Sequence, residues 1–103
     1  MIIQFNTDNI ISGNREHTEP MEAYVKEQLD RFKDVRRIEI HMGDENSHKQ
    51  GGNDIRCMIE VKLEGVAPLA VTTHADKQFD ALKDAVAKMK TVLDKKQEKS
   101  RSY

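Results

Sequence analysis

Residues 55–64 read Ile-Arg-Cys-Met-Ile-Glu-Val-Lys-Leu-Glu, so apolar side chains recur at every second position from Ile55 to Leu63. This period of two predicts a β-strand with one face against a core. Residues 37–42 alternate in the same way, with Ile38, Ile40 and Met42 on one side. The segment 43–54 between them is rich in Gly, Asn and Asp, which favours a long exposed hairpin loop. The two stretches therefore predict a half-buried antiparallel strand pair.

Helices and shorter strands are predicted on both sides of this pair. A first strand is expected around Ile3 and Phe5, and a further strand at 69–75. One helix is expected to begin after Thr18-Glu19-Pro20 and to end near Asp34. A second helix should follow Asp76 as its cap. The apolar positions at helical spacing are Met21, Val25, Leu29 and Phe32 in the first helix, and Phe79, Leu82, Val86, Met89 and Leu93 in the second.

The resulting order is β-α-β-β-β-α, an α+β fold with a four-stranded sheet and two helices packed on one face, like a double-stranded-RNA-binding domain. We expect one domain over residues 1–98 and a flexible tail at 99–103. Its 103 residues are 37% apolar, which suits a thin core. With one cysteine, no transmembrane-length apolar run and no secretion signal, the chain is expected to be cytoplasmic without a membrane partner.

The charge is nearly balanced overall but uneven along the chain. Seventeen basic and eighteen acidic residues give −1, yet residues 1–82 carry −5 and residues 83–103 carry +4. The low total argues against indiscriminate coating of DNA or RNA. Helical geometry nevertheless places four lysines in one row opposite the apolar stripe, flanked by three more. The row is Lys77, Lys88, Lys95 and Lys99, and the flanking residues are Lys83, Lys90 and Lys96. An ordinary solvated helix face is the alternative interpretation.

Two segments resemble the short ribosome hibernation-promoting factors, also called ribosome-associated inhibitors, of the sigma-54 modulation protein type. Residues 24–31 are similar to the first helix of that family, and residues 79–99 to its second. The resemblance implies a non-enzymatic translation inhibitor that is monomeric off the ribosome and needs no cofactor. It would bind 16S rRNA in the channel for messenger and transfer RNA on the small subunit and keep idle ribosomes inactive. Basic positions of the family are matched at Arg31, Lys88, Lys95 and Lys99, the expected phosphate contacts.

The sequence also departs from that family. Gln28, Thr91 and Asp94 stand where family members tend to carry basic residues, and the 43–54 loop is several residues longer. The chain ends after the second helix, so we expect a short member without the additional dimerisation domain of long members. These departures make the chain a variant member.

Other interpretations concern the loop and the polar side of the strands. His48 and Lys49 are possible RNA contacts at the loop tip. A metal site is the minor interpretation of a group of possible ligands, because Cys57 falls on the apolar side of its strand and no closed zinc spacing is present. The group consists of His41, Asp44, Glu45, His48, Asp54, Cys57 and His74. We find no nucleophile and base arrangement and expect no enzyme activity. The competing functional class is a protein-interaction module that uses the exposed sheet face and the 43–54 loop, without RNA binding.

Overall fold

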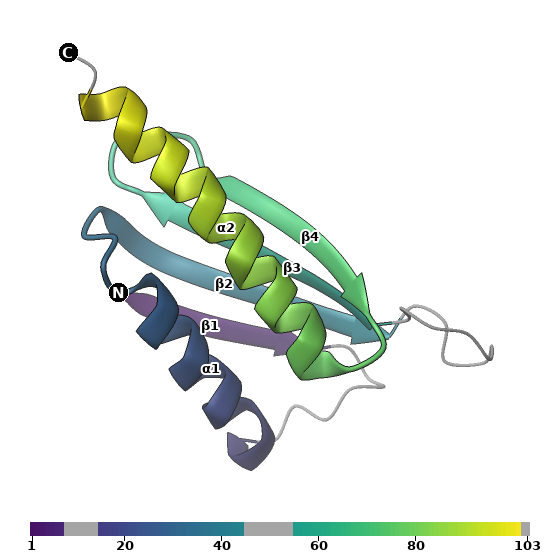
Figure 1. The fold of residues 1–103 in the computed structure, drawn as a ribbon. Helices are drawn as coiled ribbons and strands as arrows, with labels where there is room; N and C mark the ends of the chain where they lie inside the picture. The colour runs from purple at the N-terminus through teal and green to yellow at the C-terminus, as the bar shows by residue number, and fades with distance from the viewer. Residues whose placement is uncertain (8–14, 45–54, 102–103) are drawn as a thin grey trace.

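The computed structural model describes residues 1–7, 15–44 and 55–101, and the predicted order of strands and helices is confirmed in them (Figure 1). The elements are β1 (Ile2–Thr7), α1 (Arg15–Leu29), β2 (Val35–Asp44), β3 (Ile55–Leu63), β4 (Leu69–Ala75) and α2 (Gln78–Arg101). The sheet has the order β1-β2-β3-β4, with β1 parallel to β2 and the other pairs antiparallel. Both helices cover the same face of this sheet. The fold is therefore α+β with a mixed sheet.

The core lies between the sheet and the helices, and the apolar side chains of the predicted strand alternation fill it. Ile38, Ile40, Ile59 and Val61 have no exposed surface, while the residues between them point to the other face. The register between β2 and β3 shifts between Val35 and Arg37, so Arg36 is an extra residue in the ladder. This bulge keeps Val35 in the core as well, because it resets the alternation by one residue.

Small residues let α2 approach the sheet closely. Ala81 and Ala85 are fully buried, and the buried hydroxyl of Thr73 on β4 donates a hydrogen bond of 2.7 Å to the Ala81 carbonyl oxygen. The rings of Tyr24 on α1 and Phe79 on α2 meet edge to face with centroids 5.4 Å apart. These contacts fix α2 against β4 on one side and against α1 on the other.

The boundaries of α1 differ from the prediction at both ends. The helix begins at Arg15, so Pro20 lies inside it, and Thr18 is buried instead of capping the first turn. It ends at Leu29 because the Phe32 amide bonds the Leu29 carbonyl oxygen at 3.1 Å, which closes a tight turn toward β2. Phe32 lies in that turn with its side chain in the core. Its spacing from Leu29 is therefore the same as in a helix, which is why the sequence predicts a longer helix.

The second helix begins at Gln78, one residue later than a cap at Asp76 predicts, and continues to Arg101. The Ala81 amide donates a hydrogen bond of 3.0 Å to the Lys77 carbonyl oxygen, which places Lys77 at the N-cap. The flexibility of residues 99–103 and the extent of the domain over 1–98 stay predictions. Among the described residues, neither helix combines the length and the apolar character that crossing a bilayer requires.

Candidate nucleic-acid interface

Lys77, Lys88 and Lys95 lie in one row along α2, but beside the buried face and not opposite it, which corrects the predicted placement of this row. The prediction used only large apolar residues, but Ala81 and Ala85 are buried too and shift the centre of the buried face by roughly 40°. We call the flank toward the sheet edge the β4-side row, formed by Lys77, Lys88 and Lys95. Lys83 and Lys90 lie on the flank toward α1.

The β4-side row runs beside an edge strand of the sheet. Lys77, Lys88 and Lys95 are exposed, and no carboxylate of the described residues pairs with them. The Lys88 ammonium donates a hydrogen bond of 3.2 Å to the main-chain carbonyl oxygen of Thr72 on β4. This partner is neutral, so the bond holds Lys88 in place without an ion pair, although Asp84 lines the same side of the helix.

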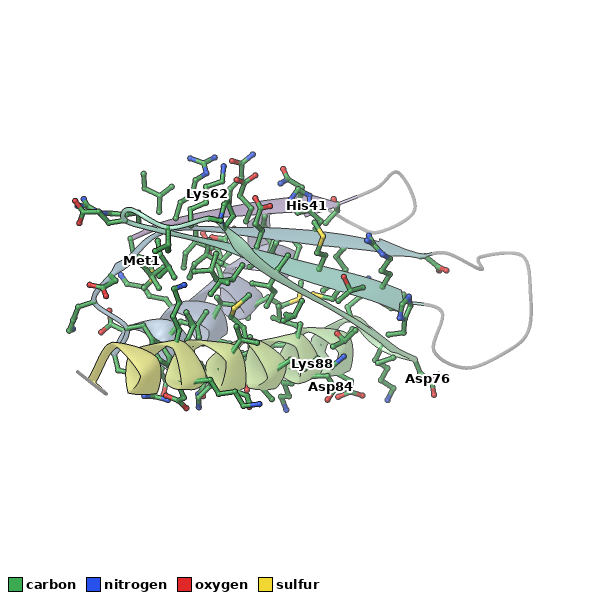
Figure 2. All side chains as sticks on the ribbon, turned by 90° about the horizontal axis from the view of Figure 1, so that it is seen from above. Met1, His41, Lys62, Asp76, Asp84 and Lys88 are labelled. Carbon is green, nitrogen blue, oxygen red and sulfur yellow. The ribbon has the colours of Figure 1, made fainter. Side chains whose placement is uncertain are left out.

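A shallow hollow of about 430 Å³ lies between α2 and the end of β4, beside Lys88. Residues from both elements line it, namely Thr72, Thr73, His74, Asp84, Ala87 and Lys88. Figure 2 shows Lys88 and Asp84 in the helical layer, below the sheet. The hollow joins the β4-side row to the edge of the sheet.

The flank toward α1 is largely occupied by contacts within the chain. Arg31, at the turn after α1, forms an ion pair of 2.9 Å with Asp94 and stacks over the Phe32 ring at 4.1 Å. Lys90 donates a hydrogen bond of 3.1 Å to the Gln28 side-chain oxygen. Lys83 lies 5.3 Å from the centroid of the Phe79 ring. Two of the departures from the family, Gln28 and Asp94, thus accept hydrogen bonds from Lys90 and Arg31.

The outward surface between the two flanks is not basic. Asp80, Asp84, Ala87 and Thr91 of α2 are exposed there, and among the described side chains of α1 the exposed acids Glu19 and Glu27 outnumber the exposed Lys26. Phosphate groups would be repelled from this helical surface. Any RNA contact of the described part is therefore favoured at the β4 side.

For the remaining predicted RNA contacts the structure gives little or no side-chain information. Lys96 is half-buried in the last turns of α2. The side chain of Lys99 and the loop residues His48 and Lys49 lie outside the described residues. Their roles stay predictions.

The sheet face turned away from the helices is covered by charged and polar side chains. Figure 2 shows His41 and Lys62 on this open face. Glu39 is its central acceptor: Lys62 lies 2.9 Å away, Arg37 3.4 Å and His41 3.9 Å. Arg37 also bonds Gln4 on β1. The Lys62 ammonium holds the pKa of the Glu39 carboxyl below its usual range, and the Arg37 charge adds to this effect.

This network predicts a pH-dependent contribution to stability. Because the pKa of Glu39 is lower in the folded state, its contribution is present above the unfolded value of about 4.3 and is lost as pH falls through the folded value. We expect Glu39→Gln to reduce the fall in the free energy of unfolding between pH 6 and pH 3, as measured by urea unfolding. Lys62→Gln should reduce the same pH dependence, because the lowered pKa of Glu39 requires both charges. A pH dependence that is unchanged in both variants would contradict the role of the Glu39 and Lys62 pair.

Cys57 faces the helices on the opposite side of the sheet from His41. It is fully buried between Ile55 and Ile59, and burial raises the pKa of its thiol to about 12. The predicted core position is therefore confirmed, and Cys57 lies on the opposite face of the sheet from His41 and His74. Among the described residues no three His, Cys, Asp or Glu side chains come together as ligands, and Glu45, His48 and Asp54 lie outside that part of the chain.

The same burial predicts an unreactive thiol. Because the thiolate is the nucleophile, Cys57 should resist a disulfide reagent at pH 8 in native protein and react fully in denaturant. As a control, Ala23→Cys on the exposed side of α1, in a Cys57→Ala background, should react at once with one equivalent. Rapid stoichiometric labelling of native Cys57 would show that β3 is less protected than its burial indicates.

Fold and surface together define a small α+β domain with a localised basic flank, a class suited to binding folded RNA by shape and phosphate contacts. The family model described as Sigma 54 modulation protein / S30EA ribosomal protein matches residues 9–101, and the chain belongs to this family. The suspected resemblance is thereby confirmed, and the family makes the chain a ribosome-associated protein.

Two solved structures share the fold at low sequence identity. The N-terminal domain of Thermus thermophilus Protein Y aligns with a TM-score of 0.70 and 18% identity, over 90% of this chain and 96% of that one. A ribosomal subunit interface protein from Coxiella burnetii aligns with a TM-score of 0.71 and 18% identity, over 95% of this chain and 99% of that one. A comparison with curated proteins found no match.

Sequence patterning does not single out Arg56 on β3, although alternation places it on the polar side of the strand. Its cross-strand neighbour His74 is named among the possible metal ligands. The strand register is the signal that could have found Arg56, since it is opposite His74, and His74 lines the same hollow as Lys88.

Proposed function

We propose that this protein binds the 16S rRNA of the small ribosomal subunit in the channel for messenger and transfer RNA, and keeps idle ribosomes inactive in non-growing cells. Membership in the family supports the ribosomal partner. The observation that carries the RNA contact is the β4-side row, three exposed lysines that form no ion pair with a described carboxylate. Their role is to bind phosphates, which provides affinity and register without reading base sequence.

The proposed binding is confined to one side of the domain. Arg31, Lys83 and Lys90 remain candidate contacts, but each has a partner within the chain. Arg31 would contribute fully only if its ion pair with Asp94 opened, which is inexpensive because both side chains are about half exposed. The β4-side row needs no such rearrangement.

The proposal is tested by sedimentation of untagged protein with purified small subunits over a salt series. We expect cosedimentation at low salt that weakens steeply between about 50 and 200 mM salt, as counterion release requires for several phosphate contacts. In a lysate gradient from growth-arrested cells the protein should migrate with small subunits or whole ribosomes. Migration with neither, together with a salt-independent complex with another protein, would instead support the protein-interaction module.

A further inference from the structure

Arg56 differs from the other arginines whose side chains the structure describes. Arg31 is paired with Asp94, Arg36 with Glu64 at 2.6 Å, and Arg37 with Glu39. Arg56 is half-buried on the open face of β3, and no carboxylate of the described residues pairs with it. Its guanidinium therefore remains available for an external anion.

Arg56 borders an open hollow on one side. The hollow has a volume of about 450 Å³, lies at the end of β1 and β2, and is also lined by Asn6, His41, Gly43 and the acidic Asp44, which forms no ion pair with Arg56. Gly43 is the partner of Arg56 in the ladder with β2 and has no side chain to fill the space beside it. A ligand can thus approach the guanidinium from above the sheet.

Arg56 is also connected to the β4-side row around the sheet edge. His74 is its register partner on β4, which places the two β-carbons about 5 Å apart. His74 in turn lines the same hollow as Lys88. Arg56, His74 and Lys88 therefore form one polar path from the open face, over the β4 edge, to α2.

We propose that RNA held by the β4-side row continues over the β4 edge onto the open sheet face, where Arg56 binds a further backbone phosphate. This inference rests on the proposed function. It follows from the distribution of charge: the α1 flank is internally paired, and the outward helical surface is acidic. The open face near Arg56 is the accessible continuation of the basic surface. An RNA strand is favoured over a protein partner because the edge presents cations and few exposed apolar groups.

Replacement of one charge tests the assignment. We expect Arg56→Glu to weaken binding to purified small subunits about tenfold at 100 mM salt and to lower the salt slope by about one. Arg56→Lys should retain most of the binding, because it preserves the charge. Lys26→Glu on the acidic side of α1 changes the net charge by the same amount and should leave binding unchanged. Circular dichroism and thermal melts establish that each variant is folded, and Arg56→Gln, with a smaller loss of binding, replaces the glutamate variant if that one does not fold.

The possible outcomes distinguish a failure of the Arg56 contact from a failure of the proposed binding to the small subunit. Binding by the wild type that Arg56→Glu and Lys26→Glu affect equally, or not at all, would overturn the assignment of Arg56 and leave the proposed function standing. Absence of any binding by the wild type would overturn the proposed function, and the assignment of Arg56 with it. Selective loss in Arg56→Glu, with a reduced salt slope, would establish the extended surface.

Discussion

Reversing two charges of the β4-side row, Lys88→Glu with Lys95→Glu, is expected to reduce binding to small ribosomal subunits by about a hundredfold or more at 100 mM salt. Each substitution removes one charge-assisted phosphate contact, and such contacts contribute about 1.5–3 kcal/mol each. The new carboxylates also repel the phosphates they face. The measurement is a sedimentation titration at several salt concentrations, in which the slope should fall by about two.

The matched control for this double variant lies on the other side of the molecule. Lys26→Glu with Lys33→Glu changes the net charge equally, and both lysines are exposed near the acidic surface of α1. If binding depended on net charge alone, both double variants would lose it to the same extent. Full binding by Lys88→Glu with Lys95→Glu would remove the β4-side row as the RNA contact, because two of its three lysines would then contribute nothing and Lys77 alone cannot account for several phosphate contacts.

The two flanks differ in a way that supports the proposed binding of RNA in one orientation by a nearly neutral protein. On the α1 flank, Asp94 and Gln28 accept hydrogen bonds from Arg31 and Lys90. At the β4 edge, Lys88 bonds a neutral carbonyl oxygen and keeps its charge. The total of −1 therefore hides a basic edge beside an acidic helical surface. Such a field orients the domain during encounter and suppresses general coating.

The strands and the helix order were predictable because each rests on a local pattern. Period-two alternation in residues 55–63 fixes which side chains of β3 enter the core, and the structure buries Ile55, Cys57, Ile59 and Val61 as predicted. Helical periodicity likewise located α2. The ends of α1 were not predictable from the same signals, because Phe32 continues the apolar spacing from a turn that only a main-chain hydrogen bond defines.

The candidate interface was predictable only in part, because it depends on contacts between distant segments. The ion pair of Arg31 and Asp94 joins residues 63 positions apart and requires α1 and α2 to lie side by side. The rotation of α2 depends on Ala81 and Ala85, which carry too little apolar surface to mark a helix face in the sequence. Arg56 joins the basic edge only through its register with His74. These features follow from packing and not from spacing along the chain.

The largest loss of stability from a single truncation is expected for Ile59→Ala at the centre of the sheet. Ile59 is fully buried, is paired with Ile40 on β2 and Val71 on β4, and belongs to the core that α2 covers. Removing three carbon atoms there leaves a cavity that the flanking strands cannot close, because their ladders fix the backbone spacing. The expected cost is about 3–4 kcal/mol in the free energy of unfolding.

A control with the same chemical change separates the cavity from the loss of a β-branched residue. Ile2→Ala on β1 removes the same atoms from a side chain that is 59% exposed, so its effect should stay within about 0.5 kcal/mol. Urea unfolding followed by circular dichroism measures both variants against the wild type. Since small domains are stable by about 5–15 kcal/mol, Ile59→Ala should shift the midpoint strongly toward lower urea. Equal effects of the two substitutions would contradict a core centred on β3, because burial is the property in which the two isoleucines differ most.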